Sequence, residues 1–312
     1  MKKTIAIYFS EPEPMADPFH KLQYLEKYKE IISAVEAQNV TVYIVRGDSY
    51  VGEGRFTHGW KFVGDKLVDT EGEVKADLIF NRDNKNTIPV INDCSIINKP
   101  AFDELCLNKL KTFETFSDIS PKTAAINSFF EYQKYIGKWE MQPEDRIVLK
   151  KNFEARGRGI VILPVSEITE DVYQDWKDVL VQEFIDSSLG IEGLVEGLHD
   201  LRVTVIDGIP INSFIRKPEE GSFLANVDLG GTGFSIDIAD VPDEVFVLID
   251  KINQQVSEYR PLIYAADFMN SPKGYKLVEL NSRPGVQHPD WSNTYKKFND
   301  AMVQMLIDAV KE

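Results

Sequence analysis

Three oxygen-bearing side chains stand in a stretch near the end of the chain that otherwise resembles an ordinary hairpin. In YAADFMNSPKGYKLVELNSRPG, residues 264–285, two apolar runs flank a turn-rich segment, and the runs carry Asp267 and Glu279. If residues 271–275 form the loop, the two acids lie opposite each other, and Asn281 points to the same face. Two carboxylates and an amide oxygen are hard ligands suited to Mg²⁺. The pattern predicts a metal site, although an exposed polar face of an edge hairpin is the simpler alternative.

A basic strand end precedes a glycine-containing loop earlier in the chain. The stretch IVLKKNFEARGRGIVIL places Lys150 at the end of an apolar run, and ARGRG follows it. The N–H and guanidinium groups of such a loop could cover phosphates. Its spacing matches neither GxxxxGK(S/T) nor GxGxxG, so a Walker-type or Rossmann site is not supported. A solvated basic turn is the alternative.

A third stretch, VLVQEFI, ends an apolar strand with Gln182 and Glu183. Backbone groups and an acid at this position could meet an adenine edge between apolar walls. An edge strand with a solvated end would show the same pattern.

Two arginines come from the strands that follow. DLRVTV places Asp200 and Arg202 on one strand face, NSFIRK adds Arg216, and GSFLANVDLGGTG offers Asn226 beside two glycines. Arginines beside an acidic metal cluster suggest charge stabilisation during phosphoryl transfer. Taken singly, such residues more often form surface ion pairs.

The elements that carry these residues follow from hydrophobic periodicity. A strand over 4–9, a helix over 20–39 and a strand over 40–45 predict an α/β layer. A small hairpin turning at VGDK, a strand ending at residue 81 and one helix over 101–116 follow. From Arg146 onward, strands mix with short helices and lead into an antiparallel series that ends in the hairpin above.

Composition limits the possible partners. The 312 residues carry 50 acids against 35 Lys plus Arg, a formal charge of −15, which opposes binding to nucleic acid. We expect no membrane association, because no segment approaches the roughly 20 apolar residues of a spanning helix. The two cysteines, Cys94 and Cys106, lack CxxC spacing and indicate a reduced pair, so a cytoplasmic location is expected.

The order of the motifs resembles the ATP-grasp superfamily, in particular the branch of glutathione synthetase and the ribosomal-protein glutamate ligase. The motifs that carry the resemblance span roughly residues 98–290: NKLKTFETF with SPKTAAI, VLKKNFEARGRGIVI, VLVQEFI, DLRVTVIDG, IRKPEEGSFLANVDLGGTG, and AADFM with GYKLVELNSRPG. The resemblance implies an ATP-grasp fold of mixed α/β and α+β class. It would have an N-terminal α/β lobe over 1–105 and two α+β lobes, over 106–180 and 181–312, that clasp ATP.

The resemblance also implies roles for single residues. Lys109 and Lys150 would bind the phosphates of ATP. The other residues expected to contact the nucleotide are Gln182, Glu183, Phe184, Ile185, Asp200 and Asn226. Asp267, Glu279 and Asn281 would be the metal ligands, and Arg202, Arg216 and Arg283 would steady the phosphoryl group and a substrate carboxylate. Two departures stand out: Lys151 replaces the family's usual proline, and the long DSSLGIEGLVEGLH segment leaves Asp186, Ser188 or Glu192 as alternatives to Asp200 near the ribose.

The activity that the resemblance implies is amide formation by an ATP-dependent carboxylate–amine ligase through an acylphosphate, with release of ADP and phosphate. ATP and Mg²⁺ are the expected cofactors, with two ions expected and Mn²⁺ as a substitute. The substrate would be an amino acid, a peptide or another carboxylate, and a homodimer is possible. Some relatives phosphorylate a hydroxyl and stop, so a kinase is the alternative; a nucleotide-binding protein without turnover is a third.

Overall fold

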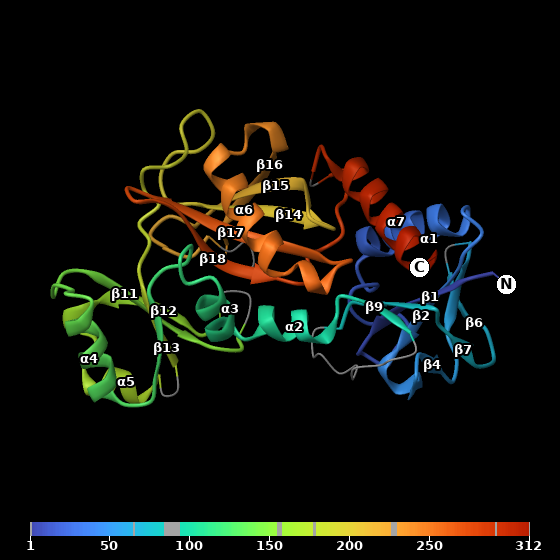
Figure 1. Ribbon diagram of the computed structural model, residues 1–312, viewed down its shortest axis with the longest axis horizontal. Helices are drawn as coiled ribbons and strands as arrows, with labels where there is room; N and C mark the ends of the chain where they lie inside the picture. Colours follow the sequence, from blue (N-terminus) through green and yellow to red (C-terminus); the bar gives the residue numbers. More distant parts are fainter. Residues whose placement is uncertain are drawn as a thin grey trace.

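The computed structural model describes residues 2–64, 66–83, 94–154, 158–176, 179–225, 230–290 and 292–311. Its strands form a six-stranded, a five-stranded, a four-stranded and a small three-stranded sheet. Figure 1 shows the six-stranded sheet at one end of an elongated molecule, the four-stranded sheet at the other, and the five-stranded sheet beside and between them. Within the described part of the chain, no helix is long and apolar enough to cross a membrane.

The N-terminal sheet has the strand order β6-β5-β2-β1-β8-β9. Its strands are β1 (Thr4–Phe9), β2 (Thr41–Arg46), β5 (Trp60–Val63), β6 (Lys66–Asp69), β8 (Leu78–Asn81) and β9 (Ser95–Ile97). β1 pairs in parallel with both β2 and β8, which confirms the expected α/β layer. The expected hairpin is also present, because β5 and β6 pair up to Val63 and Lys66.

Both faces of this sheet are covered, which explains why β1 is apolar at almost every position. The small sheet of β3 (Tyr50–Gly52), β4 (Arg55–Phe56) and β7 (Val74–Lys75) packs on one face. Helices α1 (Leu22–Glu36) and α7 (Tyr295–Lys311) pack on the other. Figure 1 shows the C-terminal helix α7 lying beside α1. The last helix of the chain therefore belongs to the core of the first lobe, whereas the predicted boundaries group it with 181–312.

The central sheet has the order β10-β13-β11-β12, and every pairing in it is antiparallel. It consists of β10 (Thr123–Ile126), β11 (Arg146–Lys151), β12 (Ile160–Pro164) and β13 (Val179–Glu183), with α4 (Phe129–Lys138) and α5 (Glu170–Gln174) on its apolar face. Ser128 caps α4 by accepting a hydrogen bond from the Glu131 N–H at 3.2 Å. The opposite face carries Lys150 and Gln182 and is left for the site.

The C-terminal sheet has the order β16-β15-β14-β17-β18 and is antiparallel throughout. Its strands are β14 (Asp200–Ile206), β15 (Ile209–Lys217), β16 (Thr232–Ile236), β17 (Ile263–Ser271) and β18 (Gly274–Asn281). Apolar residues at alternate positions pack against α6 (Asp243–Gln255) and α2 (Pro100–Leu107). The polar residues between them, including Asp200, Arg202 and Asp267, point to the other face.

The helix expected over 101–116 is in fact two helices, so that expectation was wrong. Asn108 leaves helical geometry, with φ −89° and ψ 95°, and separates α2 from α3 (Lys109–Thr115). Its side chain accepts a hydrogen bond from the Lys111 N–H at 3.2 Å, because asparagine competes for backbone donors and caps helices well. The break places Lys109 at the first position of α3.

One buried side chain joins the N-terminal lobe to the C-terminal sheet. Asn98, which follows β9, is 1% exposed. Its amide donates to the carbonyl oxygens of Ile263 at 2.7 Å and Ser282 at 2.5 Å, and its oxygen accepts from the Ile263 N–H at 2.8 Å. These bonds tie the start of β17 and the end of β18 to the edge of the first sheet.

Replacing Asn98 with alanine should therefore destabilise the protein strongly, because three buried backbone groups would lose their partner at about 1 kcal/mol or more each. We expect the free energy of unfolding in urea to fall by about 3 kcal/mol. Asn127→Ala, at an exposed position, is the control and should change it by less than about 0.5 kcal/mol. Equal small effects of both substitutions would show that the junction does not depend on Asn98.

Candidate active site

A pocket lies between the polar faces of the central and C-terminal sheets. It opens to solvent, and its empty space, counted together with that solvent, is about 890 Å³. Ten of the expected site residues line it: Lys109, Lys150, Gln182, Glu183, Phe184, Ile185, Asp200, Arg216, Asp267 and Glu279. The structure thus brings together residues that are up to 170 positions apart, from Lys109 to Glu279.

One end of the pocket is apolar. Val148, Ile160 and Ile162 form one wall, and Met269 and Val278 form part of another. Two aromatic residues also lie at this end: Phe184 and Phe223 meet edge to face with ring centroids 5.5 Å apart. The Arg146 guanidinium lies 4.3 Å from the Phe223 centroid. Such walls suit a flat heterocycle.

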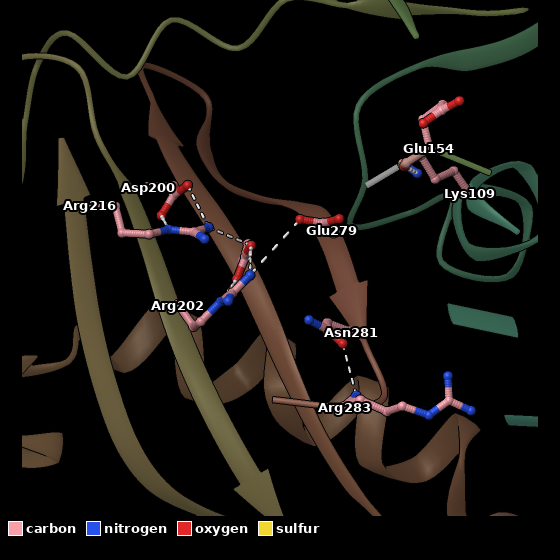
Figure 2. Close-up of polar contacts among 9 residues, drawn as sticks. Lys109, Glu154, Asp200, Arg202, Arg216, Glu279, Asn281 and Arg283 are labelled. Carbon is pink, nitrogen blue, oxygen red and sulfur yellow. Dashed lines mark hydrogen bonds and ion pairs between the residues drawn. The ribbon is translucent and has the colours of Figure 1, made fainter. Parts of the chain in front are cut away.

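Two lysines line the pocket beyond the apolar end. Lys150 is 5% exposed, and its Nζ lies 4.5 Å from the centroid of the Phe113 ring. Burial lowers the pKa of Lys150 to about 7, against the opposing attraction of Glu279. Lys109 donates to the carbonyl oxygens of Asn152, at 3.2 Å, and Glu154, and Figure 2 shows its side chain beside Glu154. Burial also lowers the pKa of Lys109.

A row of alternating charges crosses the C-terminal sheet, and Figure 2 shows it from β15 to β18. Arg216 donates to both oxygens of Asp200 at 2.7 Å and to Asp267 Oδ2 at 2.6 Å. Arg202 donates to Asp267 Oδ1 at 2.6 Å and Oδ2 at 2.7 Å, and its Nη2 lies 4.0 Å from Glu279 Oε2. We call these five residues the charge row.

The two buried acids of the charge row differ in their electrostatics. Burial opposes the ionisation of Asp267, but the charges of Arg202 and Arg216 outweigh it and hold the pKa of Asp267 well below its usual range. Burial and the neighbouring Asp267 charge raise the pKa of Asp200, while Arg216 opposes the rise. The negative charge of the row is therefore firmly held at Asp267.

The register between β17 and β18 depends on a bulge. Their connection is a two-residue turn with Ser271 opposite Gly274, not the loop over 271–275 that we expected. Continued without interruption, that register would place Val278 opposite Asp267; the irregularity after Asp267 shifts it by one, so Glu279 takes the place. Val278 and Glu279 both face the pocket as a result. The expected pairing of the two acids is present, although the reasoning from the loop was wrong.

Arg283 lies apart from the charge row. β18 ends at Asn281, whose Oδ1 accepts a hydrogen bond from the Arg283 N–H at 2.8 Å. The guanidinium of Arg283 points away from Glu279 in Figure 2 and is paired with the fully buried Asp103 of α2 at 2.5 Å. Burial raises the pKa of Asp103 to about 6 against the opposing charge of Arg283. Asn226, expected at the nucleotide, lies outside the described residues.

Comparison with known proteins places the chain in a family. A model described as the RimK-like ATP-grasp domain matches residues 108–306. The chain belongs to this family. The coenzyme γ-F420-2:α-L-glutamate ligase of Methanocaldococcus jannaschii is 25% identical over 64% of this chain and 63% of its own length. A probable α-L-glutamate ligase of Shewanella pealeana is 27% identical over 45% of this chain and 29% of its own length. The chain thus spans less than two thirds of the length of these curated relatives.

Similarity to solved structures confirms that the whole RimK-like chain has the ATP-grasp fold. D-alanyl-alanine synthetase A of Vibrio cholerae matches with a TM-score of 0.62 at 13% identity, covering 100% of both chains. The ATP-grasp ligase PsnB, solved with a precursor variant, Mg and ADP, matches with a TM-score of 0.59 at 12% identity over 97% of this chain and 99% of its own. At these identities the similarity shows the fold alone.

The oxygen-bearing side chains of the site have the chemistry that a hard divalent cation requires. Within the described residues, no cluster of three or more His, Cys, Asp and Glu side chains is arranged to hold a metal. Glu279, however, is 41% exposed at its side chain, and among the described residues its one ion pair is the 4.0 Å contact with Arg202. Asp267 Oδ1 accepts one hydrogen bond and keeps one lone pair, as does the Asn281 oxygen. A cation that takes its remaining ligands from water and phosphate fits this set.

Sequence reasoning missed the residues that support the lysines. Asn152 accepts from the Leu110 N–H at 3.0 Å and donates to Asn108 Oδ1 at 2.9 Å, so it fastens the loop after β11 to the start of α3. Phe113, beneath Lys150, was also missed. The position of Asn152 directly after the lysine pair was a partial sign of this role. Its partners Leu110 and Asn108, however, are more than forty residues away in the sequence.

Lys150 is buried and has no ion pair among the described residues, which should reduce stability, and Lys150→Met tests this. Unfolded lysine binds its proton up to about pH 10.5, whereas folded Lys150 loses it near pH 7, so the wild type gains stability as pH rises between these values. At pH 7, Lys150→Met should raise the free energy of unfolding by about 3–5 kcal/mol. At pH 9.5 the gain should shrink to about 1–2 kcal/mol.

Urea unfolding at both pH values provides the measurement, and Lys151→Met on the exposed neighbouring residue is the matched control. A gain that did not depend on pH would contradict the lowered pKa of Lys150.

Proposed function

We propose that this chain is an ATP-dependent carboxylate–amine ligase, which forms an amide through an acylphosphate and releases ADP and phosphate. The observation that carries the proposal is the pocket itself. Its apolar end suits a purine, and its two lysines suit phosphates. The charge row, which includes Glu279, adjoins the lysines. Membership of the RimK-like family and similarity to α-L-glutamate ligases support the reaction class.

In this proposal each lysine contributes charge without covalent chemistry. Lys150, buried and without a paired acid among the ion pairs of the described residues, gains its partner when a phosphate binds. Lys109 exchanges the carbonyl oxygens of Asn152 and Glu154 for phosphate oxygens. Arg202 and Arg216 fix Asp267, and Arg216 presents positive charge to the pocket, where charge develops during phosphoryl transfer.

Asp267, Glu279 and Asn281 are the proposed ligands of Mg²⁺, with two ions as the preferred count and Mn²⁺ as a substitute. When bound, such ions neutralise phosphate charge and orient the terminal phosphoryl group. The similar fold of PsnB was solved with Mg and ADP, which supports this choice of cofactors. Arg283, whose guanidinium is held by Asp103, remains a proposed contact for a substrate carboxylate and requires a rearrangement to reach it.

The substrate class that we propose is an amino acid or a peptide with a free carboxylate. Similarity to α-L-glutamate ligases supports an amino acid as the amine. Hydroxylamine trapping tests the reaction: with ATP and pooled carboxylates, an acylphosphate yields a hydroxamate. A stable phosphoester would indicate a kinase, and the absence of ADP release over all pools would argue against turnover.

Glu279→Gln should reduce ADP formation by about 100-fold or more, because it removes the most accessible carboxylate of the proposed metal site. The fold should be unchanged, since glutamine has the same shape and the position is partly exposed. ADP release and thermal unfolding provide the two measurements. Glu258→Gln, at an exposed position outside the pocket, is the control. Near-normal turnover of Glu279→Gln would rule out its role as a metal ligand.

A further inference from the structure

A hydrogen bond between neighbouring strands fixes the direction of one amide at the pocket. Thr123, on the edge strand β10, contacts the Pro121 carbonyl oxygen through its hydroxyl at 3.0 Å. A carbonyl oxygen can only accept, so the single hydroxyl proton of Thr123 is used there. The Thr123 oxygen must therefore accept from Gln182, which it meets at 2.7 Å, and Gln182 must present its NH₂ group to Thr123.

The other end of this amide is its carbonyl oxygen. Gln182 lines the pocket and is 4% exposed. Within the described part of the chain, Gln182 Oε1 accepts no hydrogen bond, and it is not among the completely buried polar atoms that lack a partner. The pocket therefore offers Gln182 Oε1 as a hydrogen-bond acceptor, and the bond from Gln182 to Thr123 sets its direction.

Strand register places this acceptor at the base end. Thr123, Gln182, Val148 and Ile162 stand side by side across the four strands of the central sheet. Lys150 is two residues beyond Val148 on β11 and points to the same face, about 7 Å further along the strand. A nucleotide with its phosphates at Lys150 thus has room for its base beside Gln182, over the apolar Val148 and Ile162.

We propose that Thr123 is a positioning residue that makes the pocket select a purine with a 6-amino group over one with a 6-oxo group. The inference rests on the proposed use of ATP and extends it to the choice of base. A 6-amino group donates to Gln182 Oε1. A 6-oxo group would place two acceptors against each other, and turning the Gln182 amide to relieve this would set its oxygen against the Thr123 oxygen.

The experiment compares binding of ADP with binding of IDP, which differs at the 6-position and carries a proton on N1. Isothermal calorimetry on the full chain gives both affinities for the wild type, Thr123→Ala and Thr123→Ser. We expect Thr123→Ala to lower the preference for ADP over IDP by about tenfold, the effect of one hydrogen bond. Thr123→Ser keeps the hydroxyl and should retain the wild-type preference. Gln182→Ala should lose the preference in the same way as Thr123→Ala.

The outcomes separate the inference from the proposed function. If ADP binds but Thr123→Ala changes the ratio by less than about twofold while Gln182→Ala abolishes the preference, Thr123 does not orient the amide. If neither substitution changes the ratio, Gln182 does not read the base, and the inference is again wrong. If the wild type binds neither nucleotide, the proposed function itself fails. Thermal unfolding of each variant shows whether a changed ratio reflects the pocket or a damaged sheet.

Discussion

Buried arginine–carboxylate pairs hold the C-terminal sheet in one register. Asp200 and Asp267 are almost completely buried, and an ion in such a place costs several kcal/mol unless a partner neutralises it. Arg216 bridges both acids and Arg202 binds Asp267 with two parallel bonds, an arrangement that adds geometric specificity. Shifting one strand by a single residue would turn these charges toward α6 and the apolar core. The charge row therefore specifies how β14, β15 and β17 align.

Because the arginines pair with the buried acids, the carboxylate of Glu279 remains accessible to a cation. Asp267 accepts three hydrogen bonds from the guanidinium groups of the two arginines. Within the described part of the chain, the one ion pair of Glu279 is the distant contact with Arg202. An accessible carboxylate beside firmly held positive charge can take a cation without losing the ion pairs of the sheet. The bulge at Val278 matters for this reason, because without it an apolar side chain would occupy the position next to Asp267.

Local patterns in the sequence predicted much of this arrangement, and long-range packing accounts for what they missed. Alternation along DLRVTV placed Asp200 and Arg202 on one face of the sheet, whereas the pairing of Asp267 with Glu279 was predicted from a loop that the structure does not have. The bulge at Val278 leaves no clear mark in the alternation of apolar and polar residues, so the loop between β17 and β18 was predicted at 271–275 and not as the shorter turn that is present. The family resemblance implied that Arg283 faces the phosphoryl group, but β18 ends at Asn281, before Arg283. The partner that then holds Arg283 is Asp103, 180 positions away. The packing of α7 against α1 is likewise invisible to local periodicity.

The two kinds of cation at the pocket show how the site relates to stability. Arg202 and Arg216 have partners in the folded chain, so their charge stabilises the sheet whether or not a ligand is present. Among the described residues Lys150 has no such partner; it lies on the Phe113 ring, and burial opposes its charge. In the proposed function a bound phosphate would supply a counter-charge, so ligand binding and protonation of Lys150 would favour each other. The fold alone would be more stable with an apolar residue at position 150, so the proposed phosphate ligand accounts for a lysine that packing does not explain.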